Sequence, residues 1–209
     1  MRRGSSTIRS QRTSQRRARR VNQRLLPRVT ALVLVGVMFG AWGLSAQKSR
    51  PREYEVKATY LYNFARFVEW PATAEAAKSR AFAICVIGQD PFGAALDAVV
   101  LGETIDGKAV LARRVMKPQD AVSCHVLYIS SSEDGRLKEI LAAIDKAGVL
   151  TVSDIPRFSQ RGGMIQFVEE SNKIRFEVNL ASAGAAGLTL SSELLKVAVT
   201  VRKVPQPGD

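Results

Sequence analysis

Apolar residues along the chain fall into short continuous runs separated by stretches with helical spacing. Continuous apolar runs at 82–87 and 125–129 predict strands that are buried on both faces, and residues 149–154 predict a third central strand. Between them, apolar residues at helical spacing predict a helix over 136–146 that Gly148 ends. A shorter helix over 92–99 is expected to begin with Asp90 as N-cap and Pro91 in its first turn. The alternation of strand and helix predicts an α/β domain with a mainly parallel sheet flanked by helices.

The second half of the chain departs from this alternation. Residues 109–115 read as a more exposed strand after a turn at 102–107. Residues 164–168 and 174–178 alternate apolar and polar positions, and Ser171-Asn172 lies in the turn between them. This pattern predicts an antiparallel C-terminal hairpin. Ser191 is expected to cap a last helix, whose apolar side contains Leu194, Leu195 and Val199.

The densest aromatic stretch, residues 60–71, comes before all of these elements. It predicts a first helix that begins at Glu53 and is stopped by Pro71. Its apolar face is expected to contain Val56, Tyr60, Phe64 and Phe67. Because large aromatic residues are usually buried, this helix is interpreted as a part of the core.

The net charge of +12 would suggest nucleic-acid binding if it were spread over the domain. Residues 1–46, however, hold ten of the 31 Lys and Arg residues and no acid. The remaining 21 basic residues face 19 acidic ones, so the rest of the chain carries only +2. Without a strongly basic domain, nucleic acid is not an expected partner.

An apolar span of fourteen residues, 31–44, follows the basic leader and precedes Ser45-Ala46. This order is typical of a secretory signal peptide. As a helix the span would rise only about 21 Å, less than the roughly 30 Å of a bilayer core, although an uncleaved inner-membrane anchor stays an alternative. We therefore expect an exported protein with a leader at 1–46, a linker at 47–52, one domain at 53–203 and a flexible tail at 204–209.

Cys85 and Cys124 are the only cysteines. In an oxidising compartment such a pair is most simply a disulfide. The alternatives are a redox-active pair, for which Cys-x-x-Cys is missing, and zinc, for which one histidine and two separated cysteines supply too few ligands. No metal or cofactor is expected.

Candidate catalytic groups are few. His125, the only histidine, begins a buried strand beside Cys124, and a structural role is favoured over a catalytic one. The loop 88–93 has two glycines but lacks the Lys-Ser/Thr of a phosphate loop, and Pro91 removes an amide. We expect no enzyme activity.

Three predicted strands end in polar loops, at 88–90, 130–132 and 153–154. Ligands of open α/β sheets bind at this edge, so a small ligand held by the amides after Gly88 and by Asp154 is one hypothesis. Glu177 could act with Asp154 as an acid or base, although an ion pair or helix cap is the simpler role for it.

Residues 57–71, with Lys-Ala-Thr-Tyr-Leu-Tyr-Asn-Phe and then Phe-Val-Glu-Trp-Pro, resemble the opening signature of the YfiR-like family of bacterial periplasmic proteins. Later segments agree in the same order, and together the resemblance covers nearly all of the chain after the leader. The later segments that agree with the family are Cys85–Gly88 with Pro91-Phe92, Cys124–Ser130, Leu150–Asp154 with Phe158, Gly162–Ile165, Asn172–Asn179, Ala186–Leu188 and Ser191–Lys196.

The resemblance implies a non-enzymatic, often dimeric α/β protein. The best-studied type represses a membrane diguanylate cyclase by binding its periplasmic domain, and an outer-membrane lipoprotein sequesters it. Cys85 and Cys124 match the family's disulfide positions, whereas a second pair found in some members is absent here. Glu177 is the first expected partner or ligand contact, followed by Leu190 and Ser191, with Asp154 from the ligand hypothesis. The other hypothesis is a small-ligand module that serves a membrane sensor.

Overall fold

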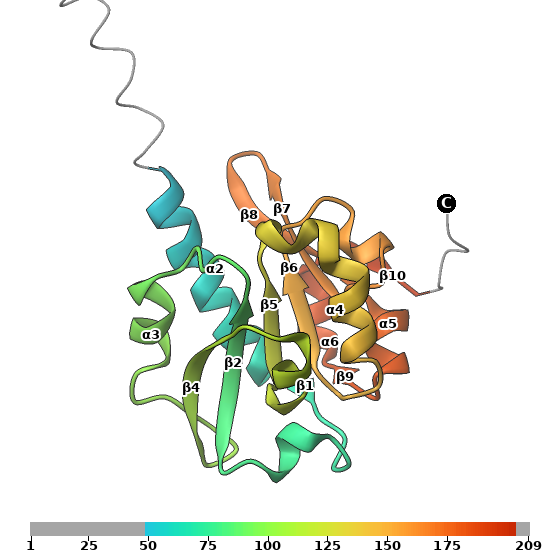
Figure 1. Cartoon of the computed structure of the whole chain (residues 1–209). Coiled ribbons are helices and arrows are strands. Elements are labelled where there is room, and N and C mark those ends of the chain that lie inside the picture. Colours follow the sequence, from blue (N-terminus) through green and yellow to red (C-terminus); the bar gives the residue numbers. More distant parts are fainter. Residues whose placement is uncertain (1–48, 204–209) are drawn as a thin grey trace, which may run out of the picture. The chain divides into compact units, whose positions relative to one another are not determined.

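The computed structural model describes residues 49 to 203 (Figure 1). The expected leader at 1–46 and the tail at 204–209 lie outside the described residues, so both stay predictions. The domain boundaries are also not tested, although the first described helix begins at Ser49 rather than Glu53.

Eight strands form the main sheet. They are β2 (Ala81–Ile87), β3 (Thr104–Ile105), β4 (Lys108–Val115), β5 (Val126–Ile129), β6 (Leu150–Ser153), β7 (Ile165–Glu170), β8 (Lys173–Asn179) and β10 (Thr200–Arg202). Their order across the sheet is β10-β8-β7-β6-β5-β2-β4-β3. The strands from β4 to β7 in that order are parallel, while β8 runs antiparallel to β7 and β3 antiparallel to β4. The predicted α/β class, parallel sheet and C-terminal hairpin are confirmed.

Helices cover both faces of this sheet (Figure 1). They are α2 (Ser49–Arg66), α3 (Ala94–Val100), α4 (Leu137–Ala143), α5 (Leu180–Ala185) and α6 (Ser192–Val197). Short 3-10 turns lie at η1 (Glu75–Lys78), η2 (Pro118–Ser123), η3 (Ser131–Arg136) and η4 (Phe158–Gln160). A separate small sheet pairs β1 (Val68–Glu69) with β9 (Thr189–Leu190) in antiparallel register.

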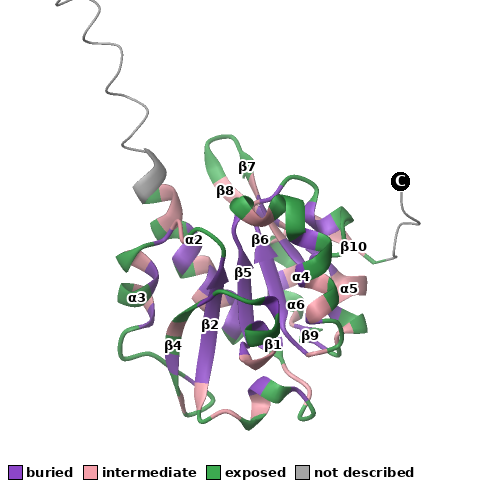
Figure 2. Cartoon of the chain, in the orientation of Figure 1, coloured by how far each residue is buried: buried purple, intermediate pink, exposed green. Residues whose placement is uncertain are grey.

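Two apolar clusters fill the spaces on either side of the sheet, and the central strands are buried along their length (Figure 2). In β5, Val126 and Tyr128 join the cluster under α2, α3, α5 and α6, whereas Leu127 and Ile129 join the cluster under α4, η2 and η4. Because successive strand residues point to opposite faces, a strand covered on both sides must be apolar throughout. This explains the continuous runs in the sequence.

The expected first helix was wrong in its end and partly wrong in its buried face, of which Phe64 is in the core and Tyr60 packs against it. Helix α2 ends at Arg66, well before Pro71, because the chain then enters β1 and pairs with β9. Val56 and Phe67 are 44% and 40% exposed, so they do not belong to the core face. The buried stripe is instead Ala58, Leu61, Phe64 and Ala65, which has the same helical spacing one step around the helix.

The expected N-cap at Asp90 was also wrong. Helix α3 begins at Ala94 with Gly93 as its N-cap. The Asp90 carboxylate accepts a hydrogen bond from the Phe92 amide at 2.8 Å, which closes a turn, and pairs with Arg114 at 2.8 Å. Asp90 therefore fixes the loop after β2 to β4 rather than beginning a helix.

Elements in the second half keep their predicted types with shifted ends. Helix α4 is shorter than the expected 136–146, because η3 includes Arg136 and the chain leaves the helix at Ile144, two residues before Lys146 at positive φ. The β7–β8 turn contains Ser171 and Asn172, both at positive φ, as a tight hairpin requires. Ser191 caps α6 by accepting a hydrogen bond from the Leu194 amide, as predicted. Val199 lies beyond that helix, where the chain leads into the unpredicted strand β10.

Candidate functional site

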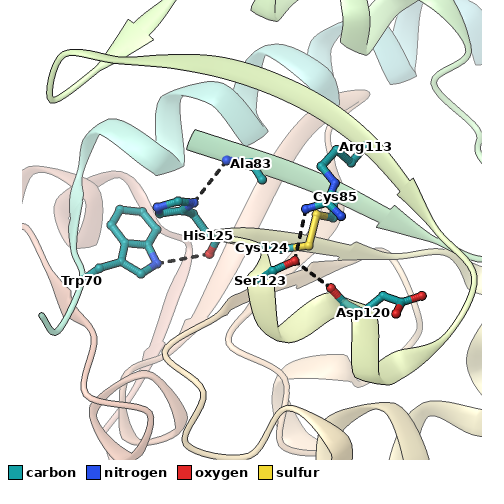
Figure 3. Close-up of a disulfide and its surroundings, with 8 residues drawn as sticks. All are labelled: Trp70, Ala83, Cys85, Arg113, Asp120, Ser123, Cys124 and His125. Atoms are coloured by element: carbon teal, nitrogen blue, oxygen red, sulfur yellow. Dashed lines mark hydrogen bonds between the residues drawn. A yellow bond between two sulfur atoms is a disulfide. The ribbon is translucent and has the colours of Figure 1, made fainter. Parts of the chain in front are cut away.

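A disulfide joins the two cysteines (Figure 3). Cys85 lies in β2 and Cys124 follows η2, with Cα atoms 6.0 Å apart and no exposed surface on either residue. The bond therefore ties η2 to the sheet within the core. The predicted pairing is confirmed.

His125 lies next to the disulfide, and both its ring and its carbonyl accept hydrogen bonds from neighbouring residues (Figure 3). Its Nδ1 accepts a hydrogen bond from the Ala83 amide at 3.1 Å, and its carbonyl accepts one from Trp70 Nε1 at 3.2 Å. The Phe82 ring stacks on the imidazole at 4.0 Å. Burial, assisted by the charge of Lys108, lowers the pKa of His125 to about 4. The ring is therefore neutral near pH 7, and its contacts are those of a structural residue.

Asp154 follows β6 and is the centre of a polar cluster with α2. Its Oδ2 atom accepts hydrogen bonds from Lys57 Nζ at 2.8 Å and from the Tyr54 hydroxyl at 2.9 Å. Lys57 is 3% exposed and also pairs with Glu53, one turn earlier on the helix. Sequence reasoning missed Lys57 and Tyr54. The one sequence feature that pointed to this cluster was Lys57, a lysine within an apolar helical stretch. Its partner Asp154 lies 97 residues later in the chain, so the sequence alone did not connect the two.

Two polar atoms near this cluster are buried and have no hydrogen-bond partner within the described residues: Asp154 Oδ1 and the Tyr128 hydroxyl. Burial works to raise the pKa of Asp154, but the hydrogen bond and charge of Lys57, with smaller effects of Tyr128 and Tyr54, lower it overall. Burial raises the pKa of Tyr128, and the Asp154 charge adds to it. Asp154 is therefore an anion, and the neutral Tyr128 hydroxyl is a hydrogen-bond donor within the same buried cluster.

A hollow of about 330 Å³ opens beside Asp154. Its lining includes Lys57, Ser131, Phe167 and the carboxylates of Glu53 and Glu169. Of the four predicted contact residues, Asp154 lines this hollow. The geometry suits a small polar group that donates a hydrogen bond to Asp154 and rests against an aromatic ring.

The loop after Gly88 lies at the same edge of the sheet but is partly occupied by the protein itself. The Gln89 amide donates a hydrogen bond to Ser132 Oγ at 2.9 Å. Gly88 has φ of 89°, and a Cβ atom there would lie 2.5 Å from that same oxygen. The Gln89 amide, which was expected to hold a ligand, thus binds η3 instead.

Glu177 does not meet Asp154, because the two carboxylates lie on opposite faces of the sheet. Glu177 is paired with Gln166 across the β7–β8 ladder, and both side chains contact Ser159 of η4 on the α4 face. Asp154 contacts α2 on the other face. The simpler role expected for Glu177 is present: Arg202 Nη2 lies 3.8 Å from its carboxylate.

Leu190 and Ser191 lie at the small sheet. Leu190 is 7% exposed and is paired with Val68. The Ser191 amide donates to the Phe67 carbonyl at 2.9 Å. The four predicted contact residues thus occupy three separate places, and their role as contacts stays a prediction.

Metal-binding clusters and membrane-spanning helices are both missing from the part of the chain that the structure describes. Among residues 49–203, no three His, Cys, Asp or Glu side chains gather in an arrangement able to bind a metal ion. In the same part of the chain, no helix combines the length and apolar character needed to cross a bilayer.

These features define a disulfide-linked α/β domain with a polar cluster at the carboxyl edge of its sheet. The chain belongs to the DUF4154, YfiR/HmsC-like family, whose model matches residues 54–199. The predicted family is confirmed. Membership is consistent with a periplasmic, regulatory and non-catalytic role. No functionally curated protein matches the chain.

Two solved structures are similar to the chain at low sequence identity. A conserved domain protein from Vibrio cholerae O1 biovar El Tor has a TM-score of 0.50 and 11% identity over 71% of this chain. An ABC domain in complex with L-Trp from Streptococcus pneumoniae has a TM-score of 0.49 and 9% identity over 69% of it. This chain spans 60% of the length of each. The first likeness supports the fold alone.

Proposed function

We propose that this protein is a periplasmic regulator that represses a membrane-bound diguanylate cyclase by contact with the cyclase's periplasmic part. The family match over residues 54–199 carries this proposal. Repression by contact requires that the protein bind one conformation of the cyclase more tightly than the other. A homodimer and sequestration by an outer-membrane lipoprotein belong to the same proposal.

Glu177 is the first residue to test as a contact. Its side chain is 21% exposed, so a partner could reach it, whereas Leu190 is nearly covered and can act only by shaping its surroundings. The experiment is co-purification of membrane diguanylate cyclases with the tagged protein, in wild-type form and as Glu177→Lys. We expect recovery with the wild type and a loss of at least about tenfold with the variant, since a reversed charge at an interface repels its former partner.

The matched control is Glu139→Lys, which makes the same charge change at an exposed position of α4. Equal recovery with all three proteins would remove Glu177 from the interface. No cyclase recovered with any of them would contradict the proposed function itself.

A second candidate is a small-ligand module that serves a membrane sensor. The hollow of about 330 Å³ that Asp154, Lys57 and Phe167 line at the carboxyl edge of the sheet favours it. A thermal-shift screen with amino acids, amines and nucleotides tests this candidate. A ligand at this site should raise the melting temperature of the wild type but not that of Asp154→Asn, and a flat response to all compounds would exclude it.

A further inference from the structure

Strand β4 leaves most of one edge unpaired. On one side it pairs with β2 along its length, from Ala109 to Val115. On the other side β3 meets only Lys108 and Ala109, and the Val110 amide donates to the Glu103 carbonyl at 2.9 Å. The order of the sheet places no strand beyond β3 within the described residues. The edge from Leu111 to Val115 is therefore open.

The backbone at this edge can accept another strand. Because the Val110 amide points outward, the alternation of a strand points the amide and carbonyl groups of Ala112 and Arg114 to the same side. A hollow of about 290 Å³ runs beside this part of β4, lined by residues 113–116 and by η2. An added strand would continue the line that β3 begins and place side chains in that hollow.

Exposed apolar side chains frame the open edge. Leu111 is 49% exposed and Met116 is 86% exposed. Figure 2 shows exposed positions along β4, in contrast to the buried neighbour β2. Natural proteins commonly protect a strand edge by shortening it, by covering it or by placing charged side chains along it. Here no strand covers residues 111–115 within the described part of the chain, so only the charged side chains protect this edge, and Leu111 and Met116 offer apolar contacts to an incoming acidic chain.

The charge of β4 indicates which kind of strand could pair with its open edge. Residues 108–117 contain four cations and no acid. Arg114 is neutralised by Asp90 and Asp97, but Arg113 donates only to the Ser123 hydroxyl, and Lys117 is exposed and makes no ion pair within the described residues. Asp120 is the one acid that lines the hollow. The edge is thus basic on balance.

We propose that the free edge of β4 binds an extended acidic segment of a partner protein by strand addition. Backbone hydrogen bonds to Ala112 and Arg114 supply the pairing, and Arg113 and Lys117 face carboxylates of the incoming strand. A second copy of β4 would set like charges across the new ladder, which opposes self-pairing. The chain's own residues 1–46 carry ten arginines and no acid, so they have the wrong charge. This inference stands on the geometry of β4 and does not require that the partner be a cyclase.

The test uses the full-length protein and three fluorescent peptides: an alternating Glu/Val hexapeptide, the same pattern with Lys for Glu, and the Glu/Val peptide with a central Pro. We expect saturable binding of the first peptide alone. The double variant Arg113→Glu/Lys117→Glu should weaken that binding at least about tenfold, while Lys138→Glu/Lys196→Glu, with the same charge change on exposed helical positions, should not.

A backbone variant separates strand pairing from simple charge attraction. Ala112→Pro removes the outward amide, and Pro is tolerated at a strand edge on the side that faces solvent. We expect it to abolish peptide binding, and circular dichroism reports whether the fold is intact. Equal binding of the Lys/Val peptide, no binding of the Glu/Val peptide, or unchanged affinity in the double variant would each overturn the proposal. A dimer in sedimentation that Arg113→Glu/Lys117→Glu disrupts would overturn it too, because the occupant would be a second copy.

Discussion

Lys57 and Asp154 form an ion pair of 2.8 Å that joins the middle of α2 to the residue that follows β6. Their side chains are only 4% and 14% exposed. A buried pair of this kind does not by itself add much stability, but removing one partner leaves the other charged and desolvated.

Lys57→Met is therefore expected to destabilise the protein by about 3 kcal/mol. Urea unfolding at pH 7 measures the change. The control is Lys78→Met, which removes an exposed pair with Glu75 and should cost less than about 1 kcal/mol. A Lys57→Met protein as stable as the control would show that Asp154 is not an isolated buried charge in the variant.

The same pair gives a pH dependence of known sign. The pKa of Asp154 is lowered in the folded protein, against the effect of burial, chiefly by Lys57. Its contribution to stability is complete above the ordinary value of 3.8 and is lost as pH falls through the lower folded value. Asp154→Asn should thus lose more stability at pH 7 than at pH 3.

His125 offers a direct spectroscopic measurement, because it is the only histidine of the chain. Burial and, to a lesser degree, Lys108 lower its pKa to about 4. The unfolded chain takes up this proton first, so stability should fall as pH drops from 6.5 toward 4. An NMR titration of the folded protein should give a midpoint near 4, and a midpoint near 6.5 would contradict the buried neutral ring.

The Cys85–Cys124 disulfide closes a loop of 39 residues and should stabilise the protein by about 4 kcal/mol on the chain-entropy model. Replacing both cysteines by alanine is expected to lower the unfolding free energy by a similar amount. Because both sulfurs are buried, reductant should open the bond much faster in urea than in buffer. Equal reduction rates in the two solvents would contradict this burial.

Trp70 is expected to contribute to the stability of the fold rather than to partner binding. Its indole packs against Phe82 at 5.2 Å and donates to the His125 carbonyl. Trp70→Ala should cost about 3 kcal/mol, as large-to-small core changes do. Phe67→Ala, an exposed aromatic position nearby, is the control and should cost less than about 1 kcal/mol. A fully stable Trp70→Ala protein that had lost partner binding would place the contact surface here.

The parallel sheet could be predicted because strands covered on both faces must be continuously apolar, and the runs at 82–87, 125–129 and 149–152 satisfy that condition. The buried face of α2 could not be fixed, since two stripes of apolar residues share helical spacing and only the packing of α2 against the sheet decides between them. Strand β10 has three half-buried residues and too little pattern to detect.

The polar cluster was predictable only in part. Asp154 stood out because it follows a buried strand, at the edge where such sheets bind ligands. Its partners Lys57 and Tyr54 lie about a hundred residues earlier, and no local pattern encodes that distance. The separation of Asp154 from Glu177 follows from strand register, which sets the face of each side chain and is not visible before the sheet is assembled.

The most direct measurement of the central claim is the intracellular level of cyclic di-GMP in a strain that lacks this protein. Repression of a membrane diguanylate cyclase predicts a higher level in the deletion strain and a return to the parental level when the wild-type gene is restored. An unchanged level in the deletion strain would contradict the account.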